Sequence, residues 1–151
     1  MISDAAGATI LHDVAEFDDG RPLIILYIGD YDPSGMWMSE HDIPTRLTDY
    51  GGTHITIKRI ALLRKDCTTL GRRVAFNVST KKKDPRAPWF RKNFGQLCWE
   101  LDAMDPNNLR ARVEEEINRH IEPEACERCR IVDEAERESM RNFFDKWTGS
   151  R

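Results

Sequence analysis

The sequence predicts an α/β fold in which a mostly parallel sheet of about four strands is flanked by helices and followed by a C-terminal helical extension. Residues 23–28, LIILYI, form a continuous apolar run, which is typical of a strand buried on both faces. Residues 53–61, THITIKRIA, alternate apolar and polar side chains, which indicates a second strand. Helical stretches lie between the strands, and this alternation predicts parallel βαβ units with right-handed crossovers.

The first predicted helix covers residues 4–17. Its apolar residues recur at spacings of four, four and three, which places them on one helix face: Ala6, Ile10, Val14 and Phe17. Residues 18–22, DDGRP, end this helix before the first strand.

Residues 34–50 also have helical character, but Pro44 lacks the amide hydrogen that an unbroken helix uses. We therefore expect two short helices, with Asp42 as the N-cap of the second and Pro44 in its first turn. The glycines at positions 51 and 52 end this unit.

The middle of the chain is less regular. Residues 63–70 have moderate helical character, and residues 74–78 fit either a short strand or a loop. Residues 80–95, TKKKDPRAPWFRKNFG, contain two prolines and end in glycine, so we expect an exposed loop there. Residues 96–101 predict a third clear strand.

Two helices close the chain. Asp105 and Pro106 suit the N-cap and first position of a helix that runs to about residue 121. Glu122 and Pro123 break the chain, and a last helix is expected over residues 124–147. We therefore divide the chain into an α/β domain, residues 1–121, and a C-terminal helix, residues 122–151, which packs on that domain or docks onto a partner.

Composition sets the expected environment. No apolar run approaches the ~20 residues that a membrane span needs, so no membrane partner is expected. The first residues carry acids and no basic segment, which does not fit a secretory signal. We expect a cytoplasmic protein whose four cysteines are reduced thiols.

Charge is distributed unevenly along the chain. Residues 58–92 contain twelve Lys or Arg against two acids, although the whole chain has a net charge of -3. This asymmetry indicates a basic surface for a polyanion beside acidic segments.

Two aspartates, Asp30 and Asp32, follow the first predicted strand directly. Alternation along an extended chain would point both side chains the same way, with their Cα atoms about 6–7 Å apart. The two carboxylates then repel one another, and Mg²⁺ removes that repulsion, because it is typically held by one or two carboxylates together with water and phosphate oxygens. The alternative is that both are turn and N-cap residues of the next helix.

The stretch of strand, Asp-x-Asp-x-x-Gly and helix resembles the Toprim domain of topoisomerases, bacterial primases and related nucleases, and most closely that of the topoisomerase VI A subunit. Its motif residues here are Asp30, Asp32 and Gly35. Residues 98–117, CWELDAMDPNNLRARVEEEI, are similar to the acidic strand end and helix that close this module in bacterial and phage-encoded members.

The resemblance implies that Asp30 and Asp32 are catalytic residues that bind Mg²⁺, with Mn²⁺ as a substitute. Such an ion stabilises charge on a phosphodiester and orients the attacking oxygen. Glu100 and Asp102, at another strand end, supply further metal ligands or hydrogen-bond partners of the ligands. For these two residues the alternative is a solvated strand end that caps the next helix.

The sequence departs from the Toprim pattern in one respect. Toprim domains place a glutamate, the usual general acid or base, between their first strand and first helix, but here only residues 1–3 precede the first helix and Glu16 lies too far along it. We therefore expect a truncated or split member, or a protein partner that supplies the missing strand.

The resemblance does not extend to the tyrosine chemistry of topoisomerases. Topoisomerase VI-type proteins cut DNA with a tyrosine on a separate winged-helix domain, and the tyrosines of this chain lie in or beside the Toprim-like core. Topoisomerase activity of the chain alone is therefore not expected, and a partner could supply the catalytic domain.

Residues 80–95 are also the predicted nucleic-acid contact, with DNA favoured over RNA. Their cations can neutralise phosphates, and their aromatic rings can stack on unpaired bases. The residues proposed for this contact are Lys81, Lys82, Lys83, Arg86, Trp89, Arg91 and Lys92. The alternative is a solvated loop whose aromatic rings fold back into the core.

A single C-x-x-C motif, Cys126 and Cys129, lies in the last predicted helix. A structural zinc site needs four ligands, and no second cysteine pair accompanies this one, so zinc is not expected. Cys129 is in line with Val132 on a helix, which indicates packing as a small apolar residue.

Three functions fit these features. The first is a Mg²⁺-binding Toprim-like domain that acts on nucleic-acid phosphodiesters, alone or within a larger enzyme. The second is a truncated, non-catalytic relative that binds nucleic acid or serves in assembly. The third is a phosphotransferase of the haloacid dehalogenase type, which also places Asp-x-Asp after a strand but usually continues with threonine or valine where Ser34 stands.

Overall fold

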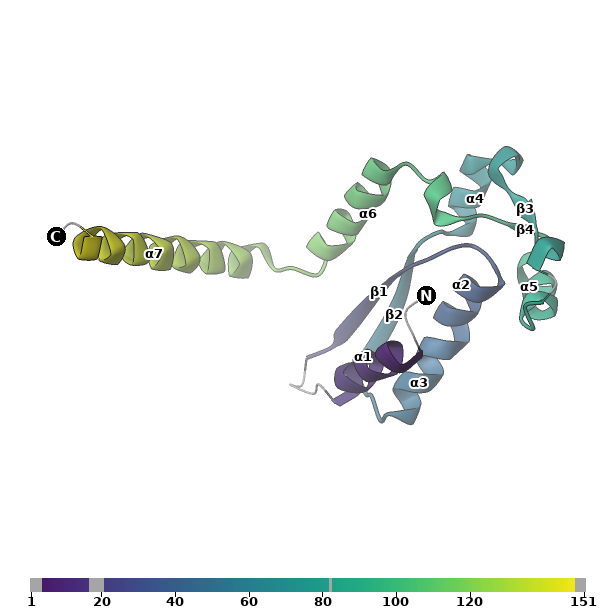
Figure 1. Cartoon of the computed structure of the whole chain (residues 1–151), viewed down its shortest axis with the longest axis horizontal. Helices are drawn as coiled ribbons and strands as arrows, with labels where there is room; N and C mark the ends of the chain where they lie inside the picture. Colours follow the sequence, from purple (N-terminus) through teal and green to yellow (C-terminus); the bar gives the residue numbers. More distant parts are fainter. Residues whose placement is uncertain (1–3, 17–20, 82, 149–151) are drawn as a thin grey trace. The chain divides into compact units, whose positions relative to one another are not determined.

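The computed structural model describes residues 4–16, 21–81 and 83–148 and shows a mixed α/β fold (Figure 1). The elements in chain order are α1 (Asp4–Glu16), β1 (Leu23–Ile28), α2 (Pro33–Trp37), the π-helical turn η1 (Met38–Asp42), α3 (Ile43–Asp49), β2 (Ile55–Ala61), α4 (Arg64–Leu70), η2 (Arg72–Val74), β3 (Phe76–Asn77), η3 (Val78–Lys81), α5 (Ala87–Phe94), β4 (Leu97–Cys98), η4 (Leu101–Ala103), α6 (Pro106–Asn118) and α7 (Pro123–Thr148). Two compact units, Met1–Arg110 and Ala111–Arg151, divide the chain inside α6, whereas the sequence places the division after residue 121.

β1 and β2 form the predicted parallel pair. Leu23 lies opposite Ile55 and Tyr27 opposite Arg59, and the register shifts after Tyr27. All six side chains of β1 are half-buried, so the prediction of a strand buried on both faces is wrong. Among the described residues β1 belongs to a sheet of two strands, in which β2 is its neighbour.

The prediction of one mostly parallel sheet is confirmed only for this pair. β3 and β4 form a separate antiparallel pair, in which Phe76 lies opposite Cys98. An antiparallel bridge also joins Tyr31, just beyond β1, to Trp99, just beyond β4, with N–O distances of 2.9 and 3.0 Å. The predicted third strand therefore approaches the end of β1 in the antiparallel direction, and only two of its residues are in strand conformation.

Residues 33–49 form one continuous helical stretch, where the sequence predicts two helices. The amide of Ile43 donates to the carbonyl of Met38, which makes the chain π-helical just before Pro44 and accommodates the missing proline amide. Asp42 is not an N-cap, because its backbone is already helical, and instead it pairs with Arg46 at 3.1 Å.

Residues 87–94 form the helix α5, so the expected exposed loop over residues 80–95 is wrong in its second half. Pro88 lies in the first helical turn, where its missing amide hydrogen costs nothing, and Gly95 ends the helix with φ +101. Phe90 has no exposed surface and joins the main apolar core. Burial of this ring favours the helix over a solvated loop.

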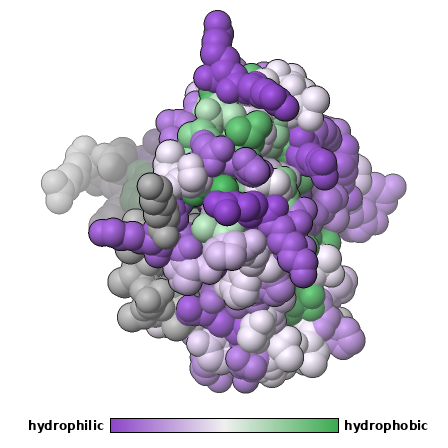
Figure 2. Space-filling view, turned by 90° about the vertical axis from the view of Figure 1, so that its right-hand side faces the viewer, coloured by the Kyte–Doolittle hydropathy of each residue, from purple (hydrophilic) through white to green (hydrophobic). Residues whose placement is uncertain are grey.

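The main core lies in the first compact unit. Its buried members are Tyr31, Met36, Ala61, Leu62, Cys67, Val78, Ala87, Phe90, Cys98, Trp99 and Met104. They come from the ends of β1 and β2, from α2, α4 and α5, and from the β3–β4 region. The outer surface on the side that carries α5, β3 and β4 is mostly hydrophilic, with small separate apolar areas (Figure 2).

The last two helices begin as predicted. One carboxylate oxygen of Asp105 accepts from the amides of Asn107 and Asn108, both at 2.9 Å, which caps α6. α7 begins at the predicted proline break and presents several exposed apolar side chains: Ile131, Val132, Met140, Phe143, Phe144 and Trp147. None of the helices in the described ranges combines the length and the apolar character needed to cross a membrane.

The four cysteines differ in burial, and we expect their reactivity to differ accordingly. Burial, with the nearby charge of Asp66, raises the pKa of Cys67 to about 11, and burial, with the charge of Asp32, raises the pKa of Cys98 to about 12. Cys126 and Cys129 are exposed. At pH 8 a disulfide reagent should therefore modify two thiols of the folded protein and all four after denaturation, since thiolates are the reactive form.

The double variant Cys126→Ser, Cys129→Ser is the matched control for this thiol count. It should lose the fast reaction completely while its circular dichroism spectrum stays unchanged. Fast modification of a third thiol in the folded protein would contradict the described burial of Cys67 and Cys98.

Candidate functional site

The turn that follows β1 is held in place by Arg59 of β2. The Arg59 guanidinium donates to the carbonyls of Gly29 at 2.6 Å, Gly35 at 2.9 Å and Leu62 at 2.9 Å, and also to the carbonyl of Asp30. The same group lies 5.1 Å from the ring centroid of Tyr27. One half-buried cation thus joins the end of β1, the start of α2 and the end of β2.

Gly35 allows α2 to approach this turn closely. A Cβ atom at position 35 would lie 2.3 Å from the carbonyl oxygen of Asp30, a distance that side chains do not tolerate. Position 35 therefore requires glycine because the backbone of Asp30 lies too close for a side chain, and not because of an unusual φ angle.

Asp32 is almost completely buried and is the N-cap of α2. One carboxylate oxygen accepts from the amide of Gly35 at 2.7 Å, and the other forms an ion pair with the Lys81 ammonium group. The capping role that the sequence left as an alternative is therefore observed, and the positive charge beside the buried carboxylate comes from Lys81.

Asp30 contacts a different part of the chain. One of its carboxylate oxygens accepts from the amide of Leu101 at 2.8 Å, which ties the turn after β1 to η4. Asp30 also lines a surface hollow together with Glu100 and Asp102, whose own side chains are exposed. Met104, Pro106 and Leu109 form the apolar side of this hollow.

The structure thus brings three of the four predicted metal ligands to one hollow and gives Asp32 other partners. The prediction that Asp30 and Asp32 point the same way is wrong, because β1 ends at Ile28 and the strand alternation ends with it. Asp32 turns toward α2 and Lys81, whereas Asp30 turns toward η4.

The donor set of the hollow suits a hard cation with few protein ligands. Among the described residues, no three His, Cys, Asp or Glu side chains lie close enough together to hold a metal ion. Mg²⁺ nevertheless needs only one or two carboxylates, because water and phosphate oxygens complete its shell. Asp30, with Glu100 or Asp102, supplies oxygen donors of that kind.

Three of the predicted nucleic-acid residues contact other side chains of the protein. Lys81 pairs with Asp32, and Arg86 pairs with Asp84 at 2.8 Å. Trp89 packs against Trp37 and His41, with ring centroids 5.0 Å apart in both pairs. The aromatic rings thus turn toward the protein, as the alternative interpretation of this segment expects.

The remaining cations of that segment are placed differently. Lys83, Arg91 and Lys92 are exposed, and Lys82 lies outside the described residues. Lys83 and Arg91 line a second hollow that also contains Asp84, so their charges face a carboxylate.

Comparison of the chain with protein-family models, with curated proteins and with solved structures gave no match.

The sequence does not single out Arg59 among the basic residues of positions 58–92. One signal could have found it. Arg59 interrupts the apolar end of β2, and in a parallel pair that end lies beside the end of β1, where the backbone turns and its carbonyls need donors.

We expect Gly35→Ala to lower the free energy of unfolding by about 1–3 kcal/mol, the usual cost of forcing extra volume into a packed site. The clash is with the Asp30 carbonyl, which Arg59 holds in place. Urea denaturation measures the change. Ser34→Ala, at the neighbouring position, is the control and should change stability by less than about 0.5 kcal/mol. A wild-type midpoint for Gly35→Ala would contradict the close approach described above.

Proposed function

We propose that this chain is a Toprim-like domain that binds Mg²⁺ beside the carboxyl end of β1 and acts on nucleic-acid phosphodiesters, alone or as part of a larger enzyme. The observation that carries the proposal is the shared hollow of Asp30, Glu100 and Asp102. Sites of open α/β folds form where strands end, and Asp30 lies two residues beyond β1.

The electrostatics of the hollow favour a cation. Its charged lining residues are all carboxylates, so their summed charge attracts a positive ion to the hollow. The bond from the Leu101 amide orients Asp30, so that this carboxylate is held ready before any ion binds. A bound Mg²⁺ would stabilise negative charge on a phosphodiester.

Asp32 has a supporting role in this proposal. The resemblance implies that Asp32 is a metal ligand, but in the structure the Lys81 ammonium group pairs with its carboxylate. The Lys81 side chain is about one third exposed, at 32%, and its flexible stem can carry the ammonium group into solvent. Asp32 is thus available as a metal ligand only when Lys81 leaves.

The second candidate function is a non-catalytic module that binds nucleic acid or serves in assembly. The Lys81–Asp32 pair favours it, because an internal cation already neutralises one motif carboxylate. The two-stranded sheet favours it as well, since among the described residues β1 has β2 as its one strand neighbour and a partner can add a strand at the other edge.

The decisive experiment is a Mg²⁺ titration by calorimetry, together with cleavage assays on plasmid and single-stranded DNA. Asp30→Asn should weaken Mg²⁺ binding at least about tenfold and abolish metal-dependent cleavage. Asp13→Asn, which removes an exposed carboxylate of α1, is the matched control and should behave as wild type. Nucleic-acid binding without cleavage would favour the non-catalytic module, and turnover of a small phosphomonoester would favour the phosphotransferase.

Lys81→Met separates the roles of the two aspartates. The variant leaves the Asp32 carboxylate buried without its cation, so we expect about 1–3 kcal/mol lower stability in a metal-free buffer. If Asp32 is a metal ligand, Mg²⁺ should raise the Tm of Lys81→Met by more than it raises that of the wild-type protein, because binding to the folded state stabilises it. An equal shift in both proteins would exclude Asp32 from the metal site.

A further inference from the structure

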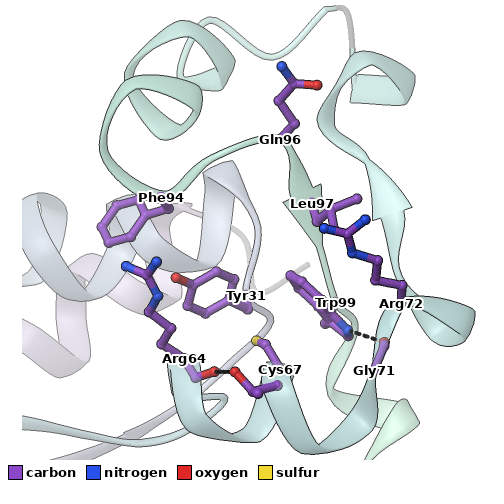
Figure 3. Close-up of a pocket in the computed structure, with 10 residues that line it drawn as sticks. Tyr31, Arg64, Cys67, Gly71, Arg72, Phe94, Gln96, Leu97 and Trp99 are labelled. Carbon is purple, nitrogen blue, oxygen red and sulfur yellow. Dashed lines mark hydrogen bonds between the residues drawn. The ribbon is translucent and has the colours of Figure 1, made fainter.

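A second pocket lies in the first compact unit. It is a pocket of about 360 Å³ formed by α4, β4, the last residue of α5 and the chain beyond β1 (Figure 3). The pocket and the acidic hollow share no lining residue. The lining residues that carry the argument are Tyr31, Arg64, Arg72, Phe94 and Trp99.

The charged side chains of this pocket are both arginines. Arg64, the first residue of α4, and Arg72, the first residue of η2, are exposed, and within the described parts of the chain neither guanidinium has a carboxylate partner. In Figure 3 the two arginines lie on opposite sides of Tyr31 and Trp99. The pocket is therefore suited to a ligand that carries a negative charge at each end.

Three aromatic rings form a wall of the pocket: in Figure 3 Tyr31 and Trp99 lie between the two arginines, and Phe94 lies on the Arg64 side of Tyr31. The rings of Phe94 and Trp99 each lie 5.9 Å from the ring of Tyr31, all measured between centroids. The indole nitrogen of Trp99 donates to the carbonyl of Gly71 at 3.0 Å, which fixes that ring (Figure 3). Tyr31 and Trp99 are largely buried, so the half-buried Phe94 offers most of the ring surface to a ligand.

The Tyr31 hydroxyl is a polar group that the protein leaves available. It has no hydrogen-bond partner among the described residues. Every buried side-chain polar atom in that part of the chain does have a partner, so this hydroxyl is not a fully buried atom. The hydroxyl therefore reaches solvent, and Tyr31 lines this pocket. A ligand thus meets one hydroxyl between two cations.

We infer that this pocket binds one unpaired nucleotide of a single-stranded nucleic acid. Within a strand each base has a phosphate on either side, which matches an arginine on either side of Tyr31 and Trp99. Arginine forms paired hydrogen bonds with phosphate oxygens, and a base packs against the aromatic rings with little regard to its identity. The inference rests on the proposed function in one respect, the choice of nucleic acid as the class of ligand.

The test is fluorescence anisotropy with a labelled single-stranded oligothymidylate in EDTA, where the acidic hollow holds no Mg²⁺. Arg64→Gln and Arg72→Gln should each weaken binding at least about fivefold and reduce the salt slope by about 0.7, the value for one phosphate of a single strand. Arg73→Gln, an exposed arginine that does not line the pocket, is the matched control and should change affinity by less than about twofold.

Two further probes test the role of the base. An abasic strand of the same length should bind at least about fivefold more weakly, because base stacking is lost. A duplex of the same length should also bind more weakly, since paired bases cannot reach the aromatic wall. Circular dichroism confirms that each arginine variant is folded.

Three results would overturn the inference: equal affinity for single-stranded, abasic and duplex probes, arginine variants that match the Arg73→Gln control, or no binding of the single strand in EDTA. None of them depends on the acidic hollow, because Arg64 and Arg72 do not line it. Loss of Mg²⁺ chemistry would conversely leave these measurements unchanged, so the two proposals fail separately.

Discussion

The arrangement of the turn after β1 depends on one cation, Arg59, and on the backbone carbonyls to which it donates hydrogen bonds. Just beyond β1, the Gly29 carbonyl accepts from the Leu62 amide at 2.8 Å and also from the Arg59 guanidinium, and the same guanidinium donates to the carbonyl of Asp30. The same group binds the Gly35 carbonyl in α2. Because arginine presents several donors in one rigid plane, a single side chain can join three chain segments here.

The two motif aspartates, close in sequence, have separate environments. Asp32 is buried, caps α2 and pairs with Lys81, so its charge is balanced inside the protein. Asp30 contacts the Leu101 amide at a surface hollow whose lining holds two more carboxylates and no Lys or Arg. The two carboxylates of the motif therefore have different roles: Asp32 is a structural residue, and Asp30 is the candidate metal ligand of the proposed function.

The basic segment shows how packing redistributes charge and aromatic surface. Two of its rings, Trp89 and Phe90, pack in or against the core from α5. The prolines at positions 85 and 88 obscure the periodicity of that short helix in the sequence. Two of its cations pair with aspartates. Arginines without a carboxylate partner in the described chain instead flank the pocket of Tyr31, Phe94 and Trp99, which residues far apart in sequence form together.

The sequence alone determined the local features: the strands β1 and β2, the glycine end of α3, the Asp105 cap and the break before α7 all depend on residues a few positions apart. It also pointed to Asp30, Asp32 and Gly35 as one structural unit. The tertiary structure decided the partners of the charges, since Lys81 and Asp32 are 49 positions apart and Leu101 and Asp30 are 71 apart. It also decided the antiparallel direction of β4, which follows from backbone pairing between Tyr31 and Trp99 and not from any periodicity. Local patterns carry propensity and capping, whereas charge pairing and pocket formation depend on which distant segments meet.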